Sequence, residues 1–409
     1  MTCGFVRSFC YYGQDRAIKG DPRDAPTPGG LDQEGATSMA VQNVPPLHGA
    51  AQIAALLDSP EITGLISDLQ ETRWTGRRGY PIRAMVGLAL VKSVYVLPTW
   101  SRTVRLVAEH AALRAAIGDV PSVHAAYRFT GKLREHGDML TTCIDRVLTA
   151  LRERLPDMGT DLAIDGSDLP AYANGMRDLP NGKPREHYAD PDASWGHRSA
   201  ISTRKGGGFY GYKVHAAVCT HTGLPVAWRV QSAADSEHEH MSSLLDTALR
   251  RGFTPGTCVL DKGYDGSGIY AVCESRDVRP VIPLKRTVNV VNGMHKPPSC
   301  QHGEWSFAGS DAKRGASKWR CPTGACAPRS VWVKADRLHT LIPRSTDRWK
   351  AIYRTRGAVE RAFGVLKHEW GMLPLRVRRL PRVRLHVDLT ILARLACALT
   401  KARAVPLAA

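Results

Sequence analysis

The hydrophobic pattern changes near residue 160, and this change limits the fold more than any other feature. Before it, segments such as AAQIAALLD, IRAMVGLALVKSVYVL, TVRLVAEHAALRAAIG and VHAAYRFTGKLREHG carry apolar residues at spacings of three and four, which predicts helices. After it, short apolar runs such as DLAIDG and GTCVLD alternate with helix-like segments such as HEHMSSLLDTALRRG. Strands that alternate with helices indicate an α/β sheet. The sequence therefore predicts a helical N-terminal region followed by an α/β (α+β) domain.

The order of the predicted strands defines the second region further. FYGYKVHAAVCT and LPVAWRVQSA predict two paired strands, GTCVLDKGYDG predicts a strand that ends in a turn, and RPVIPLKR predicts another strand. A segment containing Cys and Pro then interrupts the pattern before the last helices. We predict four parts: a disordered segment at 1–46, a helical DNA-binding domain at 47–155, a core at 156–286 and 346–400, and an insertion at 287–345.

The net charge indicates a polyanionic partner. The chain has 409 residues, a formal net charge of +18 and a pI of about 9.7. Such a surplus favours binding to nucleic acid. A ribosomal or RNA-associated protein and an arginine-rich genome are the alternatives. In the helical region, the basic residues fit either a solvated face or a DNA-binding surface.

The cysteines do not form the pattern of a disulfide scaffold. Ten cysteines are scattered along the chain. The first residues lack the apolar core of a signal peptide. We also find no long uncharged apolar run that could form a transmembrane helix. We therefore expect a soluble protein in a reducing compartment. Within the insertion, Cys300, His302, Cys321 and Cys326 fit either a structural zinc site or a loop with unliganded thiols.

Two aspartates stand at the predicted ends of strands. Asp165 in AIDGSD and Asp261 in VLDKGYDG each follow an apolar run and precede a turn that contains glycine. In α/β sheets the chemistry gathers at the carboxyl ends of strands, although an aspartate there is also a common turn former. Asp168 and Asp265 lie close by, and we rank them second because they are predicted to follow the start of each turn.

A glutamate near the C-terminus completes a possible set of three carboxylates. In IYRTRGAVERAFGVLKHEWG we predict one helix that carries Tyr353, Arg356, Glu360 and Lys367 on a stripe about 60° wide. Two aspartates and one glutamate can converge on Mg²⁺, which prefers hard oxygen ligands. Without a cation, each pair of carboxylates about 4 Å apart would repel by roughly 4 kcal/mol. A solvated helix face with an exposed Arg–Glu pair is the alternative.

Taken together, these segments resemble the DDE transposases of bacterial insertion sequences, which have a ribonuclease H-like catalytic core. The last helix matches their Tyr-x2-Arg-x3-Glu-x6-Lys signature at every position. AIDGSD and VLDKGYDG resemble the two aspartate strands, GYKVH resembles the strand between them, and YPIRAMVGLALVKSVY resembles their N-terminal domain. The resemblance covers roughly residues 55 to 400.

The resemblance implies a site and a reaction. Asp165, Asp261 and Glu360 would be the catalytic and metal-binding residues, with two Mg²⁺ ions, or Mn²⁺, in each site. The reaction would be cleavage at transposon ends and strand transfer into target double-stranded DNA, by a homodimer or larger synaptic complex in the bacterial cytoplasm at the nucleoid. Alternatives are a nuclease of the same fold that cuts without joining, a non-catalytic DNA-binding descendant, and a zinc-containing nucleic-acid-binding module. The predicted DNA-binding residues are Tyr353, Arg356, Lys367, Lys213, Arg378 and Arg379.

Overall fold

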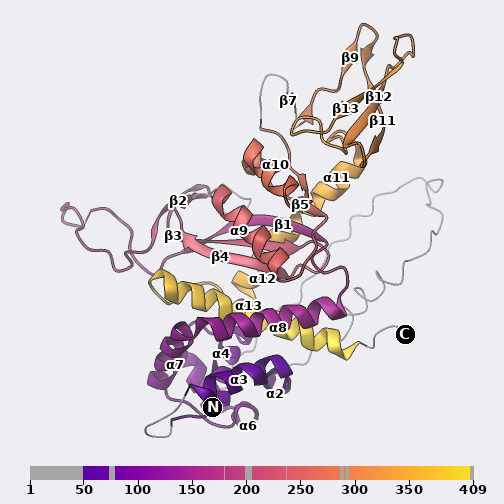
Figure 1. Ribbon diagram of the computed structural model, residues 1–409. Helices are drawn as coiled ribbons and strands as arrows, with labels where there is room; N and C mark the ends of the chain where they lie inside the picture. The colour runs from indigo at the N-terminus through magenta and orange to yellow at the C-terminus, as the bar shows by residue number, and fades with distance from the viewer. Residues whose placement is uncertain are drawn as a thin grey trace, which may run out of the picture.

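The molecule is elongated, with a mixed sheet between a helical end and a small β-rich end (Figure 1). The computed structural model describes residues 49–72, 79–178, 180–198, 205–235, 237–285, 290–291 and 294–405. The segment 1–46, which we predicted to be disordered, lies outside the described residues.

The N-terminal region consists of helices joined by short connections. The segment TVRLVAEHAALRAAIG, predicted as one helix, is divided at His110, whose extended backbone (φ −103°, ψ 104°) breaks the hydrogen-bond ladder. Side-chain oxygens of Thr99 and Ser122 cap two of the helices by accepting backbone N–H groups. The helices are α2 (Gly49–Leu57), α3 (Pro60–Glu71), α4 (Ile82–Val94), α5 (Trp100–Glu109), α6 (Ala111–Ile117), α7 (Val123–Glu135) and α8 (Gly137–Arg154).

The central sheet is mixed. Its main strands are β1 (Asp161–Pro170), β3 (Gly207–Cys219), β4 (Pro225–Ser232), β5 (Thr257–Val259) and β6 (Arg279–Val281). Strand β3 pairs antiparallel with β1 on one edge and with β4 on the other, whereas β5 is parallel to both β1 and β6. The resulting order, β4-β3-β1-β5-β6, is consistent with the predicted ribonuclease H-like core. An additional strand, β2 (Ser194–Arg198), pairs with the first part of β3.

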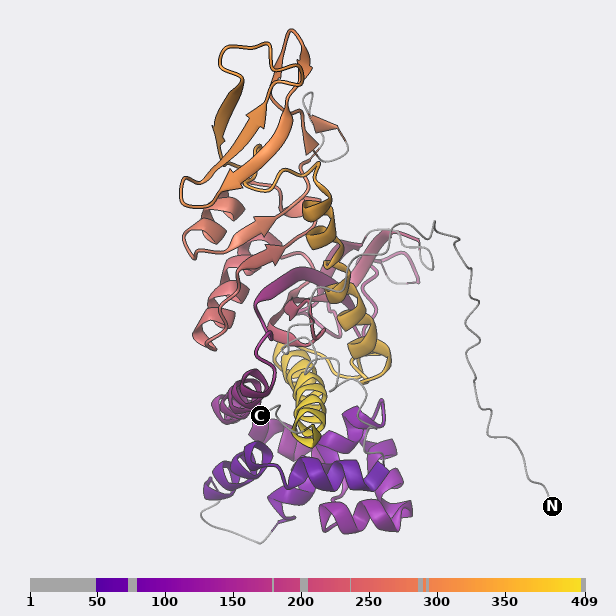
Figure 2. The same ribbon diagram turned by 90° about the vertical axis from the view of Figure 1, so that its right-hand side faces the viewer.

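Helices cover the sheet on both sides. Figure 2 shows α9 (Glu237–Arg250) and α10 (Ser267–Glu274) on one side and α11 (Asp347–Arg354) and α12 (Gly357–His368) on the other. The 25-residue helix α13 (Leu380–Ala404) packs against α8, α4 and β4. Its buried residues belong to one hydrophobic cluster that continues from the N-terminal helices into the sheet.

The insertion forms a small β-rich module. Its main sheet contains β11 (Ser306–Asp311), β12 (Ala316–Arg320) and β13 (Ser330–Lys334), all antiparallel. The remaining strands are β7 (Val290–Val291), β8 (Met294–His295), β9 (Ser299–Cys300) and β10 (Gly303–Glu304). The module has a separate apolar cluster in which Trp305, Trp319 and Cys321 are buried.

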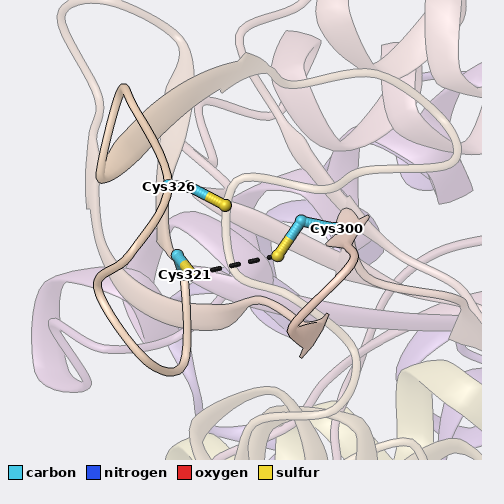
Figure 3. Close-up of side chains that lie close together, drawn as sticks. All are labelled: Cys300, Cys321 and Cys326. Carbon is cyan, nitrogen blue, oxygen red and sulfur yellow. Dashed lines mark hydrogen bonds between the residues drawn. The ribbon is translucent and has the colours of Figure 1, made fainter.

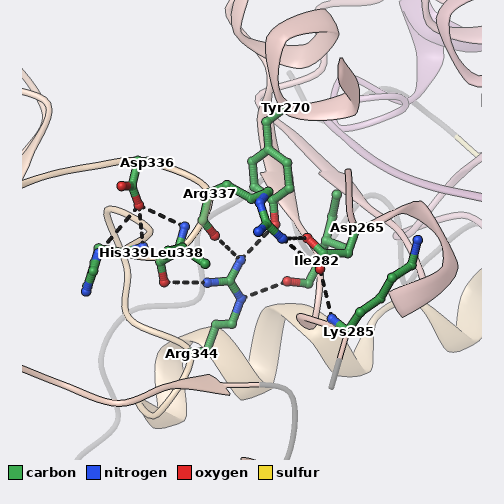
Figure 4. Close-up of polar contacts among 9 residues, drawn as sticks. All are labelled: Asp265, Tyr270, Ile282, Lys285, Asp336, Arg337, Leu338, His339 and Arg344. Atoms are coloured by element: carbon green, nitrogen blue, oxygen red, sulfur yellow. Dashed lines mark hydrogen bonds and ion pairs between the residues drawn. The ribbon is translucent and has the colours of Figure 1, made fainter. Parts of the chain in front are cut away.

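A polar network anchors the insertion to the core (Figure 4). The Arg344 guanidinium is buried and donates to the carbonyls of Ile282, Leu338 and Arg337 and to the Tyr270 hydroxyl. Asp265 is also buried and accepts two hydrogen bonds from Arg337. These contacts join the end of the insertion to the segment that follows β5.

Among the described residues, no helix combines the length and the apolar character that crossing a bilayer requires.

A partly buried carboxyl in α13 should give the fold a pH-dependent stability. Desolvation raises the pKa of Asp388 to about 6, although a hydrogen bond from Trp228 Nε1 (2.7 Å) opposes the shift. The unfolded value is about 3.9, so the folded protein binds the proton more tightly. Relative to Asp388→Asn, the wild type should therefore lose up to about 3 kcal/mol of stability as the pH rises from 4 to above 6. Urea unfolding of both proteins across this pH range would measure it, and parallel pH profiles would contradict it.

Candidate active site

Asp165 lies within a strand and not at its end. Strand β1 pairs with β5 only over residues 161–163 but stays paired with β3 as far as Pro170. Our expectation that the strand ends at this acid was therefore wrong, because the 13-residue β3 keeps β1 extended. Asp165 nevertheless lies two residues beyond the last parallel pair, Ala163 and Val259.

Asp261 follows the neighbouring strand. It lies two residues beyond Val259, the last residue of β5, just as Asp165 lies two residues beyond Ala163, the β1 partner of Val259. Its carboxylate accepts the N–H of Gly263 (2.7 Å) and caps the short 3₁₀ helix η1 (Lys262–Tyr264). A Cβ atom at Gly263 would lie 2.8 Å from the same oxygen. Glycine at 263 thus permits the turn that fixes Asp261.

The helix that carries Glu360 is interrupted. We predicted one helix over residues 352–371, but α11 ends at Arg354 and α12 begins at Gly357. The connection is tightened because the N–H groups of Thr355 and Arg356 bond to the carbonyls three residues back. The single-helix prediction was therefore wrong, since regular spacing does not reveal a tightened turn. Arg356 occupies the N-cap position of α12, and its side chain makes no capping hydrogen bond there.

Arg356 connects carboxylates from two elements. Its guanidinium donates to Asp165 Oδ2 (3.0 Å) and, in a second ion pair, to Glu360 Oε1. Burial by itself lowers the pKa of Arg356, but the nearby carboxylates, Asp165 first, then Glu360 and Asp261, outweigh burial and raise it. Asp261 therefore contributes to the same negative field as the other two carboxylates.

Tyr353 borders the same group of charges. Its ring stacks on Trp349 with centroids 5.1 Å apart. Burial raises the pKa of the Tyr353 hydroxyl, and the nearby Arg356 opposes that shift. Tyr353 is thus a neutral, partly buried neighbour of Arg356.

The donor set fits a divalent metal of the Mg²⁺ type. Three carboxylates supply hard oxygens, and a cationic group already lies between two of them. The site is open to solvent, since the side chains of Asp165 and Glu360 are 22% and 58% exposed. Closing around an ion would require the Arg356 side chain to leave its position between them.

The fourth signature residue is paired inside the protein. Lys367 Nζ lies 3.2 Å from Asp168 Oδ1, and both side chains are 10% exposed. Arg198 contacts the other oxygen of Asp168 at 3.3 Å. Our expectation that Asp168 follows the start of a turn was wrong, because it lies in β1 opposite Lys213 of β3.

The other predicted DNA-binding residues occupy different places. Lys213 is half-buried within the sheet. Arg378 and Arg379 are exposed on the segment before α13. The Arg378 guanidinium donates to the Tyr172 carbonyl (2.8 Å) and lies over the Tyr172 ring.

A groove between the N-terminal helices and the start of α13 contains Arg378, which we predicted to bind DNA, but the sequence did not predict the groove itself. Among the described residues that line it, several are cationic or aromatic and none is acidic. We call it the basic groove. Its aromatic residues carry no charge and lie far apart in the sequence, so only the fold brings them together. Its cationic and aromatic residues are Lys92, Arg134, Arg376, Arg378 and Arg382 with Trp100, Tyr127 and Tyr172.

Three cysteines of the insertion lie together (Figure 3). The sulfur atoms of Cys300, Cys321 and Cys326 are within 4.8 Å of one another, and those of Cys300 and Cys321 are 3.8 Å apart. His302, the fourth residue of the pattern in the sequence, is not in this group. Its Nε2 lies 3.2 Å from Gln301 Nε2.

Comparisons with known proteins identify the family of the chain. None of the curated proteins matches the sequence. A cryo-EM structure of the piggyBac transposase synaptic complex with hairpin DNA resembles the chain with a TM-score of 0.40 and 11% sequence identity, over 87% of this chain and 75% of that one. The family model described as "Transposase DDE domain" matches residues 157–396, which contain Asp165, Asp261 and Glu360 and make up more than half of the chain. The chain therefore belongs to the transposase DDE domain family, a family of phosphoryl-transfer enzymes.

Proposed function

We propose that this chain is the DNA transposase of a bacterial insertion sequence, and that it cuts the ends of its own element and joins them to target DNA. The observation that carries the proposal is the Arg356 guanidinium, bound by Asp165 and Glu360 in the field of Asp261. A strand residue and a helix residue thereby pair with one cation, and the charge of Asp261 acts on the same cation. Family membership supports the same class of reaction.

The proposed chemistry divides among the residues of the site. Asp165, Asp261 and Glu360 would hold Mg²⁺ or Mn²⁺, which when bound stabilises charge on the attacking and leaving oxygens at phosphorus. Gly263 N–H keeps the Asp261 carboxylate in position. When its carboxylate partners bind the metal, Arg356 can bind a phosphate through two parallel hydrogen bonds. Tyr353 stands beside Arg356 and would border the same phosphate.

We propose that DNA runs from this site to the basic groove. Asp165 lies five residues before the end of β1, and Tyr172, which lines the basic groove, follows that end by two residues. Arg378 and Arg379 lie at the groove end of this path. Lys213 of β3 is a further proposed contact, and a DNA-contact role for Lys367 stays a prediction.

Substitution of two groove arginines tests this path. Arg376→Ala with Arg378→Ala should weaken DNA binding about equally for all sequences, because phosphate contacts carry no base information. The slope of log affinity against log salt should fall by about 0.9 for each phosphate that is no longer neutralised. Fluorescence anisotropy over a series of salt concentrations would measure both. Arg250→Ala, an exposed arginine on α9, is the matched control, and an equal weakening in that variant would contradict a specific path.

Joining distinguishes a transposase from its alternatives. Purified protein would be incubated with labelled DNA carrying the flanking element ends and with a target plasmid, in Mg²⁺ or in EDTA. We expect metal-dependent nicking followed by strand-transfer products. Cutting without joining would favour a nuclease, and end binding without cutting would favour a non-catalytic DNA-binding protein. Because two ends must be brought together, the active species should be a dimer or larger complex with DNA in size-exclusion chromatography.

A further inference from the structure

The insertion has little apolar core for its size. Within its described part, the separate cluster buries only Trp305, Trp319 and Cys321. Small β modules with so little buried apolar surface are usually stabilised by disulfides or by a metal ion. Cys300, Cys321 and Cys326 are free thiols, so no disulfide among them serves this purpose.

The spacing of the thiols matches a metal site. A zinc–sulfur bond is about 2.3 Å long, so two thiolates at tetrahedral positions lie about 3.8 Å apart. The Cys300 and Cys321 sulfurs are 3.8 Å apart. The Cys326 sulfur completes a group within 4.8 Å, and Figure 3 shows the three side chains pointing toward one another.

Two separate loops present these thiols. Cys300 lies in the β9–β10 hairpin, whereas Cys321 and Cys326 lie in the loop between β12 and β13. Gly324 has a left-handed backbone (φ +69°) and donates its N–H to the Cys321 carbonyl (3.2 Å), which turns the loop so that Cys326 returns to Cys321. The rings of Trp305, Trp319 and Phe307 belong to the same apolar cluster. An apolar shell of this kind limits water access to a metal.

We propose that Cys300, Cys321 and Cys326 bind a structural Zn²⁺ ion as three thiolates of a tetrahedral site whose fourth ligand is water. The ion would join the hairpin to the β12–β13 loop and supply the stability that the small apolar cluster lacks. Binding would release the thiol protons, so zinc affinity should fall as the pH is lowered. The proposal is independent of DNA cleavage, because it concerns only the fold of the insertion.

Metal content of the purified full-length protein tests the proposal. Protein prepared without chelators should contain one zinc ion per chain by mass spectrometry. Cys321→Ser and Cys326→Ser should each lower zinc affinity more than about a hundredfold, because each removes a direct ligand. Cys397→Ala, a buried cysteine of α13, is the matched control and should keep its zinc. The Co²⁺-substituted protein should show the intense visible absorption of a tetrahedral thiolate site.

Hydrogen exchange separates loss of zinc from general unfolding. In Cys321→Ser, amides of β11, β12 and β13 should lose protection while those of β1 and α13 keep it. His302→Ala should retain its zinc, because the histidine lies outside the thiol group. A zinc-free wild type that also fails to take up added Zn²⁺ would overturn the proposal, as would zinc retention in Cys321→Ser. Zinc loss in His302→Ala equal to that in Cys321→Ser would overturn the three-thiolate description.

Discussion

Asp165→Asn, Asp261→Asn and Glu360→Gln should each reduce DNA strand cleavage by about a thousandfold or more. Each amide keeps the shape of the side chain but removes a charge that a divalent metal requires. DNA binding should survive, because removing a negative charge from the site lessens its repulsion of phosphates. Single-turnover cleavage of labelled ends, beside anisotropy on the same DNA, would measure the two quantities separately.

A nearby glutamate supplies the control for these substitutions. Glu369 lies just beyond α12 and is exposed. The Glu369→Gln protein should therefore cut DNA at the wild-type rate. Mn²⁺ should also raise the melting temperature of the wild type more than that of Asp165→Asn, which reports on the metal site without requiring activity. Cleavage that persists in Glu360→Gln would mean that another carboxylate completes the site.

Asp168→Ala should lower the free energy of unfolding by about 3–5 kcal/mol, the usual cost of removing one partner from a buried ion pair. The substitution leaves Lys367 and Arg198 without the carboxylate that both contact. Lys367→Met should cost less, because Arg198 still pairs with Asp168. Urea unfolding of the single and double variants would give the coupling energy between Lys367 and Asp168.

The same variants test the two roles of Lys367. If the ion pair dominates, the double variant should be more stable than the sum of the two single effects predicts. A Lys367→Met protein with unchanged stability but weaker DNA binding would instead support the phosphate contact predicted from the signature. Asp145→Asn, which affects an exposed carboxylate paired with Arg251, provides a comparison for an ion pair closer to the surface.

Much of the core could be predicted because its signals are local. The alternating runs around Asp165 and Asp261 predicted the strands, and the spacing in HEHMSSLLDTALRRG predicted α9. Where β1 differs from its predicted length, a nonlocal contact is responsible. β1 continues past Asp165 because β3 is long enough to pair with it, and no pattern within β1 encodes the length of its partner.

The details of the site depend on tertiary structure in the same way. Helical spacing placed Lys367 on a polar stripe with Glu360, but its amine is buried because Asp168 lies across from it. The basic groove needs Tyr127 of α7, Tyr172 after β1 and Arg376 before α13 to be adjacent. The tertiary structure brings these residues together, and no local pattern in the sequence predicts that they are neighbours.

The two ends of the molecule are attached to the sheet in different ways, and this difference bears on how such proteins can diverge. The N-terminal helices and the sheet share one hydrophobic cluster with α13. If the helical region were replaced by that of a relative, its apolar side chains would have to pack against the existing side chains of α13. The polar contacts between the insertion and the core centre on Arg344, Arg337 and Asp265. Three compatible side chains are easier to retain during recombination than a packed core. The insertion is therefore the part that evolution can exchange, while the helical region and the sheet are inherited as one unit.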